Sequence, residues 1–202
     1  MGLFNKNEEQ SIKRLSQNAG GIIEMLKAAF MTPNGVDIRM SLIYAAGLAG
    51  YACHQAVKAE HGSFVVATSK DGRNYYFGDD VNKYLVENKF SVLGSIAVVA
   101  EMSEDDVTSI VKEFAESIGG DNTICDFAPK DLYNRIKQCW DGIFENMTSR
   151  YCKSPSEWPI LFSIVTQNIL KKAIEIGAPK EQAGKIAAEC AVALSKMDDD
   201  SI

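Results

Sequence analysis

Apolar residues recur three and four positions apart along most of this 202-residue chain, and this spacing restricts it to a mainly α-helical fold. The first such stripe runs from about Glu8 to Met31. The length of the chain suits one hydrophobic core. We therefore expect a single-domain helical bundle of about seven helices over residues 9–197, with a β-hairpin insertion at about 63–78. Residues 1–8 are expected to be a flexible N-terminus and residues 198–202 a solvated acidic tail.

Small residues dominate the second predicted helix, which follows a turn at Thr32–Gly35, begins at an Asp37 N-cap and ends near Glu60. Small side chains let neighbouring backbones approach closely, so we place this helix at the centre of the bundle. Its most apolar run, Ser41–Cys53, is too short to span a bilayer. The small residues on its several faces are Ala45, Ala46, Gly47, Ala49, Gly50, Ala52 and Ala56.

Capping signals mark two of the later helices. Ser103 is followed three residues on by Asp106, the spacing of an N-terminal capping box. Pro129 suits the first turn of a helix, and a continuous apolar stripe follows it to Tyr151. Trp140 lies on that stripe and is expected to pack in the core.

One segment breaks the helical spacing and predicts a β-hairpin. The runs Phe64–Thr68 and Tyr75–Phe77 flank Asp71-Gly72, a dipeptide favoured in tight hairpin turns. With Asp71 and Gly72 as the two loop residues, Thr68 pairs with Tyr75 and Val66 pairs with Phe77. One face then carries Phe64, Val66, Tyr75 and Phe77, and the other carries Val65, Ala67 and Tyr76.

Both faces of the predicted hairpin are apolar, and a lone two-stranded ribbon is at best marginally stable in water. Something must therefore cover it. The cover is either the protein's own helices, or a second copy or protein partner that adds to the open strand edge. The candidate interface residues are Phe64, Val66, Tyr75, Tyr76 and Phe77.

Charge and cysteine usage exclude several classes of partner. The formal net charge is −6 and the basic residues are scattered, so the chain lacks the cationic face that nucleic acid or an anionic membrane requires. The stretch Met1–Gln10 has no secretory signal. Five widely spaced cysteines without a C-x-x-C pair indicate reduced thiols that pack as small hydrophobes in a cytoplasmic protein.

Polar residues that could carry chemistry are few, and His54, Asp79 and Asp80 are the candidates for a pocket. Paired acids hold cations or transfer protons, but Asp79 or Asp80 can instead cap a short helix that runs to Glu87. His54 and His61 lack the i, i+4 spacing of a helical zinc pair, so no metal is expected. A dyad of His54 with a cysteine stays open. No phosphate-binding glycine motif occurs, so no cofactor is expected.

Two runs, Tyr76–Leu85 and Ala188–Asp198, are similar to segments of uncharacterised bacterial proteins of about this length. The resemblance implies a bacterial origin and membership of a family of unknown function. It implies no activity and transfers no site residues.

These observations favour a non-enzymatic, cytoplasmic interaction protein that forms a homo-oligomer or binds a protein partner through the hairpin. The alternative is a small-molecule-binding protein or hydrolase with a pocket near His54, Asp79 and Asp80. A deep polar pocket that collects those three side chains would favour the alternative. Uncovered apolar surface on the hairpin would favour the interaction protein, whereas complete enclosure of Tyr75–Phe77 by the protein's own chain would count against it.

Overall fold

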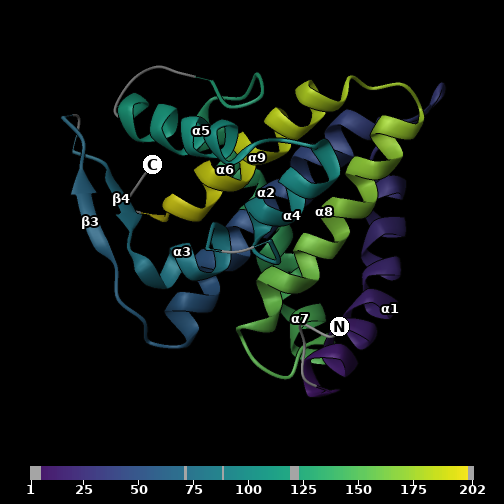
Figure 1. Cartoon of the computed structure of the whole chain (residues 1–202), viewed down its shortest axis with the longest axis horizontal. Coiled ribbons are helices and arrows are strands. Elements are labelled where there is room, and N and C mark those ends of the chain that lie inside the picture. Colours follow the sequence, from purple (N-terminus) through teal and green to yellow (C-terminus); the bar gives the residue numbers. More distant parts are fainter. Residues whose placement is uncertain (1–5, 71, 88, 119–122, 200–202) are drawn as a thin grey trace.

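A computed structural model of the chain describes residues 6–70, 72–87, 89–118 and 123–199. These residues form a single, mainly α-helical domain, as predicted (Figure 1). The longer helices are α1 (Lys6–Ala29), α2 (Ile38–Ala59), α5 (Glu104–Ser117), α8 (Glu157–Glu175) and α9 (Lys180–Lys196). The shorter ones are α3 (Asp79–Leu85), α4 (Val92–Ala100), α6 (Pro129–Cys139) and α7 (Glu145–Tyr151), with a π-helical turn, η1 (Trp140–Phe144), between α6 and α7.

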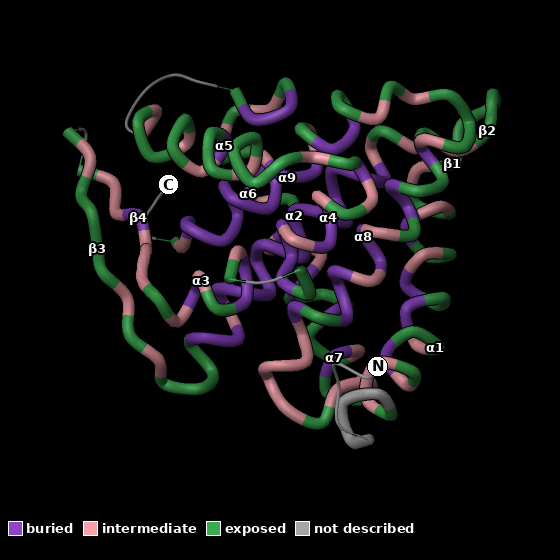
Figure 2. Tube along the Cα trace, viewed as in Figure 1, coloured by how far each residue is buried: buried purple, intermediate pink, exposed green. Residues whose placement is uncertain are grey.

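Helix α2 forms the centre of the bundle, as its composition predicts. Every residue of Ser41–His54 is buried, so α2 has neighbours on all sides, and its most extensive contacts are with α8 and α9. Figure 2 shows these three helices as the main buried part of the chain. The predicted cap is also confirmed, because the Asp37 carboxylate accepts a hydrogen bond from the Met40 backbone N–H at 3.0 Å.

A glycine allows α2 and α9 to pack backbone against backbone. A Cβ atom placed on Gly50 would lie 2.0 Å from the carbonyl oxygen of Ala191, far inside the limit of real contacts. Gly47, one turn earlier, faces the side chain of Ile136 in α6, which a Cβ would meet at 3.0 Å. The small-residue pattern of α2 therefore reflects a close crossing of two helices.

Capping residues were predicted at two other helix starts, and the structure confirms one of them. Ser103 and Asp106 form the predicted capping box at the start of α5, with reciprocal hydrogen bonds of 3.1 and 2.8 Å. At α3 the prediction that Asp79 or Asp80 is the cap is wrong, because Gly78 takes that position with φ of 137° and both acids lie in the first turn. Their negative charges there still interact favourably with the positive N-terminal end of the helix dipole.

The predicted hairpin is present as β3 (Val65–Thr68) and β4 (Asn74–Phe77), but its register differs by one residue. Thr68 pairs with Asn74 and Val66 with Tyr76, where the sequence predicted Tyr75 and Phe77. The loop has three residues rather than two, because Ser69 N–H binds the Arg73 carbonyl and Gly72 adopts a φ of 85°. A slip of one residue moves every side chain of one strand to the other face, so Val65 now lies beside Phe77.

The predicted turn at Thr32–Gly35 contains a second, smaller hairpin of β1 (Met31–Thr32) and β2 (Gly35–Val36). Helix α1 begins at Lys6, two residues before the predicted start, and the preceding part of the expected flexible N-terminus lies outside the described residues. The predicted core position of Trp140 is confirmed, since its ring lies 5.6 Å from that of Trp158 and 4% of the residue is exposed.

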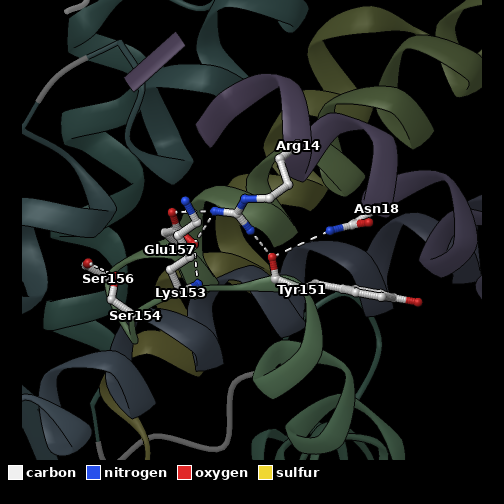
Figure 3. Close-up of polar contacts among 7 residues, drawn as sticks. All are labelled: Arg14, Asn18, Tyr151, Lys153, Ser154, Ser156 and Glu157. Atoms are coloured by element: carbon white, nitrogen blue, oxygen red, sulfur yellow. Dashed lines mark hydrogen bonds and ion pairs between the residues drawn. The ribbon is translucent and has the colours of Figure 1, made fainter. Parts of the chain in front are cut away.

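An arginine in α1 ties that helix to the connection between α7 and α8 (Figure 3). The Arg14 guanidinium donates to both carboxylate oxygens of Glu157, at 2.6 and 2.7 Å, and also to the Tyr151 carbonyl. Glu157 accepts a further bond from the Lys153 N–H at 2.6 Å. Burial by itself raises the pKa of Glu157, but these bonds outweigh it and hold the pKa below its usual value.

We predict that Gly50→Ala lowers the free energy of unfolding by about 3 kcal/mol, the upper end of the usual cost of overpacking, since the new methyl group forces α2 away from α9. Gly20→Ala is the matched control, because that position in α1 is open to solvent and alanine favours a helix there by up to about 1 kcal/mol. Urea unfolding followed by circular dichroism measures both. Equal effects of the two substitutions would contradict the close crossing.

We also predict an acid-sensitive contribution from Glu157. Its pKa is lower in the folded state than in the unfolded state, so the stabilisation exists above the unfolded pKa and is lost as the pH falls through the folded one. Between pH 6 and about 3, Glu157→Gln should therefore lose less unfolding free energy than the parent protein. Glu24→Gln is the matched control, because it removes an exposed ion pair to Lys27 of the kind that contributes little to stability.

Candidate functional site

The two strands of the larger hairpin differ in how the bundle covers them. Strand β4 lies against the helices, and Tyr75, which is 5% exposed, packs edge-on against Phe114 of α5. Phe77 lies under the Lys196 ammonium group of α9, 5.3 Å from the ring centroid. On the opposite face, the ring of Tyr76 packs edge-on against that of His54, with ring centroids 5.3 Å apart. The protein's own helices therefore hold β4 on both faces, so the predicted interface residues Tyr75, Tyr76 and Phe77 pack against the protein's own chain.

Strand β3 is uncovered. All four of its residues are exposed, and Val65 and Val66 expose 66% and 49% of their surface. Neighbouring side chains in a strand point to opposite faces, so both faces of β3 are open. Figure 1 and Figure 2 show β3 as the outer strand, with β4 between it and the helices. Residues 63–69 carry no charged side chain that would protect the edge.

The backbone of β3 also presents an open edge. Ser69 donates to the Arg73 carbonyl, which makes this a hydrogen-bonded pair. Antiparallel pairs alternate between bonded and non-bonded, so the N–H and C=O groups of Val66 and Thr68 point away from β4. Strand β3 thus offers two donor and acceptor pairs to a further strand.

A buried histidine anchors the base of the hairpin. His54 is fully buried, and its ring stacks on Phe64 with centroids 4.7 Å apart. Its Nδ1 lies 3.3 Å from the Ser195 carbonyl oxygen, and its Nε2 lies 3.3 Å from a carboxylate oxygen of Asp198. The histidine therefore joins α2, the hairpin and the segment after α9.

Asp198 corrects the prediction of a solvated acidic tail. Its side chain is only 15% exposed and accepts a hydrogen bond from Lys58 at 2.7 Å. Burial favours the neutral acid, but the bonds to His54 and Lys58 outweigh it and hold the pKa of Asp198 far below its usual range. Asp199 accepts a bond from Tyr133 at 3.1 Å. Residues 200–202 of the predicted tail lie outside the described residues.

The three predicted pocket residues do not converge on one cavity. His54 is enclosed, Asp79 is exposed, and Asp80 accepts bonds from the Ser63 N–H and hydroxyl at 2.8 and 3.0 Å. Those bonds lower the pKa of Asp80 and make it a link between α3 and the start of β3. Pockets of about 340, 380 and 700 Å³ are lined by other residues, mainly of α4 and α5.

Nucleophilic and metal chemistry find no support near the hairpin. The Cys53 thiol donates to the Ala49 carbonyl at 3.3 Å, and burial raises its pKa, so the hypothesis of a dyad with His54 gains nothing. Within residues 6–70, 72–87, 89–118 and 123–199, no group of three or more potential ligands could hold a metal ion. In the same ranges, no helix has the length and apolar character to cross a membrane.

A buried lysine next to the hairpin is a feature that the sequence did not reveal. Lys196 is 1% exposed, and its ammonium group donates to Asn82 of α3 at 3.2 Å. Burial lowers its pKa to about 8. Lysines near the end of a helix are typically exposed and interact with the helix dipole. No local sequence signal therefore marks Lys196 as a buried lysine.

We predict that Lys196 makes stability rise with pH. Its pKa is lower in the folded state than in the unfolded state, so the folded protein gains relative stability as the pH rises from about 8 to 10. Over this pH range the free energy of unfolding of the parent protein should rise more than that of Lys196→Met, by on the order of 2 kcal/mol. Urea unfolding at pH 7.5 and pH 10 measures the difference. Parallel pH dependence of the two proteins would show that the amine is already solvated.

Comparison of the chain with protein-family models, with curated proteins and with solved structures gave no match. The predicted similarity to uncharacterised bacterial proteins stays a prediction. The geometry of the hairpin is therefore the basis for assigning a function.

Proposed function

We propose that this protein is a non-enzymatic interaction protein that self-associates by pairing β3 with β3 of a second copy. The observation that carries the proposal is the exposure of both Val65 and Val66 on an uncharged edge strand outside the bundle. We place the protein in the cytoplasm, because its odd number of separated cysteines fits a reducing compartment.

Antiparallel pairing of two β3 strands is self-complementary. The outward N–H and C=O groups of Val66 can bond to those of Val66 in the second copy, with a two-fold axis between them. Thr68 then lies opposite Phe64. The result is a four-stranded antiparallel sheet in which Val66 lies beside Val66 of the second copy and Val65 lies opposite Ala67 of the second copy.

Charge supports the same arrangement. The hairpin tip carries Lys70, Asp71 and Arg73, one more basic than acidic residue, and the base carries Glu60 and Asp79. Antiparallel pairing places the basic tip of one copy beside the acidic base of the other. Between them, residues 63–69 have no charge to repel their counterparts. A second copy therefore fits this edge electrostatically although the net charge is −6.

The size of the strand limits the affinity. An edge of four residues buries less than the roughly 1,200 Å² of a standard stable interface. The dimer should therefore be weak and depend on protein concentration. Added salt should weaken it further by screening the attraction between tip and base.

We predict that Val66→Lys weakens dimerisation at least about tenfold, since it places two like charges at the two-fold axis. Val98→Lys is the matched control, because Val98 is 64% exposed on α4, outside the hairpin. Sedimentation equilibrium over a wide concentration range measures the association. Circular dichroism should show the same helicity for both variants.

A parent protein that stays monomeric at the highest concentrations would overturn the proposal. So would a dimer that Val98→Lys weakens as much as Val66→Lys does. Weakening of the dimer by Val66→Lys but not by Val98→Lys would support the pairing of the β3 strands. Weakening of the parent dimer by added salt would support the proposed charge arrangement.

A further inference from the structure

Two cysteines far apart in the sequence lie in direct contact. Cys125 belongs to the turn before α6 and Cys190 to the middle of α9, and their sulfur atoms are 2.8 Å apart. That distance is shorter than the roughly 3.5–4 Å optimum of nonbonded contacts and longer than the about 2.05 Å of a disulfide. Among the described residues, no other pair of thiols is in contact.

The turn holds Cys125 in position at a conformational cost. Ile124 and Phe127 exchange backbone hydrogen bonds of 2.8 and 2.9 Å, and the two residues between them both have positive φ, 50° for Cys125 and 73° for Asp126. Such angles are unfavourable for residues other than glycine. An ion pair of 2.5 Å between Asp126 and Arg39 holds the other corner of the turn.

We propose that Cys125 and Cys190 form a redox site, which hydrogen peroxide converts into a disulfide. The Cys125 sulfur attacks one peroxide oxygen, the O–O bond breaks, and a sulfenic acid and one water result. The Cys190 sulfur then attacks the Cys125 sulfur. The S–S bond forms, the S–O bond breaks, and hydroxide leaves with the Cys190 proton as a second water. The two thiols lose two electrons and the peroxide gains them.

The surroundings decide the order of the two steps. Cys125 is 8% exposed, whereas Cys190 is completely buried. Burial, followed by the contact with Cys125, raises the pKa of Cys190. The thiolate is the nucleophile, so the more accessible Cys125 meets the oxidant and Cys190 resolves the sulfenic acid.

The disulfide would close a long loop that contains α6, α7 and α8. It would fix the turn to α9 on one side of the 340 Å³ pocket, whose wall includes Ile124, Glu189 and Tyr75 of the hairpin. Closing a long loop stabilises a protein mainly by restricting its unfolded state. Oxidation should therefore raise stability and stiffen this pocket wall, independently of self-association through β3.

The test treats the reduced full-length protein with hydrogen peroxide, blocks free thiols and maps peptides by mass spectrometry. The expected product links Cys125 to Cys190 within one chain, lacks two hydrogen atoms, runs as a monomer on non-reducing gels and is reversed by dithiothreitol. Its urea midpoint should exceed that of the reduced protein. Cys125→Ser should form no link and show no shift, whereas Cys139→Ser should behave like the parent.

Three outcomes would overturn the proposal. They are a link through Cys139 or Cys152, a sulfinic acid at Cys125 without a link to Cys190, and reduced Cys125 after peroxide has oxidised other thiols. Because Cys125 lies in a turn at the edge of the core, Cys125→Ser should keep the helical circular dichroism of the parent. That spectrum separates loss of the link from loss of the fold.

Discussion

The close crossing of α2 and α9 at Gly50 and Ala191 is the constraint on which the rest of the structure depends. Because the two backbones touch, α9 lies in the core along its length and most of its residues are buried. The end of α9 is thereby carried to the base of the hairpin. Lys196 and Asp198 reach α3 and His54 there, and Cys190 reaches the turn before α6. The contacts around both proposed sites follow from this one approach.

The hairpin combines a fixed strand with an open one. Aromatic side chains of β4 alternate between α5 and α9 on one face and His54 on the other, so the bundle fastens both faces of this strand. Strand β3 receives its hydrogen bonds from β4 and almost no cover from the helices. A rigid inner strand holds an exposed edge in a defined shape, which reduces the entropy lost when another strand pairs with it.

Polar groups of differing burial gather where the hairpin meets the bundle, and most of them have partners within the fold. Asp198 accepts a hydrogen bond from Lys58 and lies 3.3 Å from His54 Nε2, and Lys196 is held by an amide oxygen and an aromatic ring. Groups that already have such partners are poor candidates for acid–base work on a substrate. This is the physical reason for preferring an interaction role for the hairpin over the predicted pocket of His54, Asp79 and Asp80.

The sequence by itself determined what depends on neighbouring residues: the helical stripes, the Asp37 cap, the Ser103 capping box and the existence of the hairpin. Tertiary structure decided the register, because distant side chains hold the β4 aromatics: Tyr75 packs on Phe114, Phe77 lies under Lys196 and Tyr76 packs on His54. In that register Ser69 and Arg73 close a three-residue loop. It also decided which strand stays open, why Asp198 is half-buried, and which cysteines meet. Those outcomes depend on side chains that lie far apart in the chain, where local spacing carries no information.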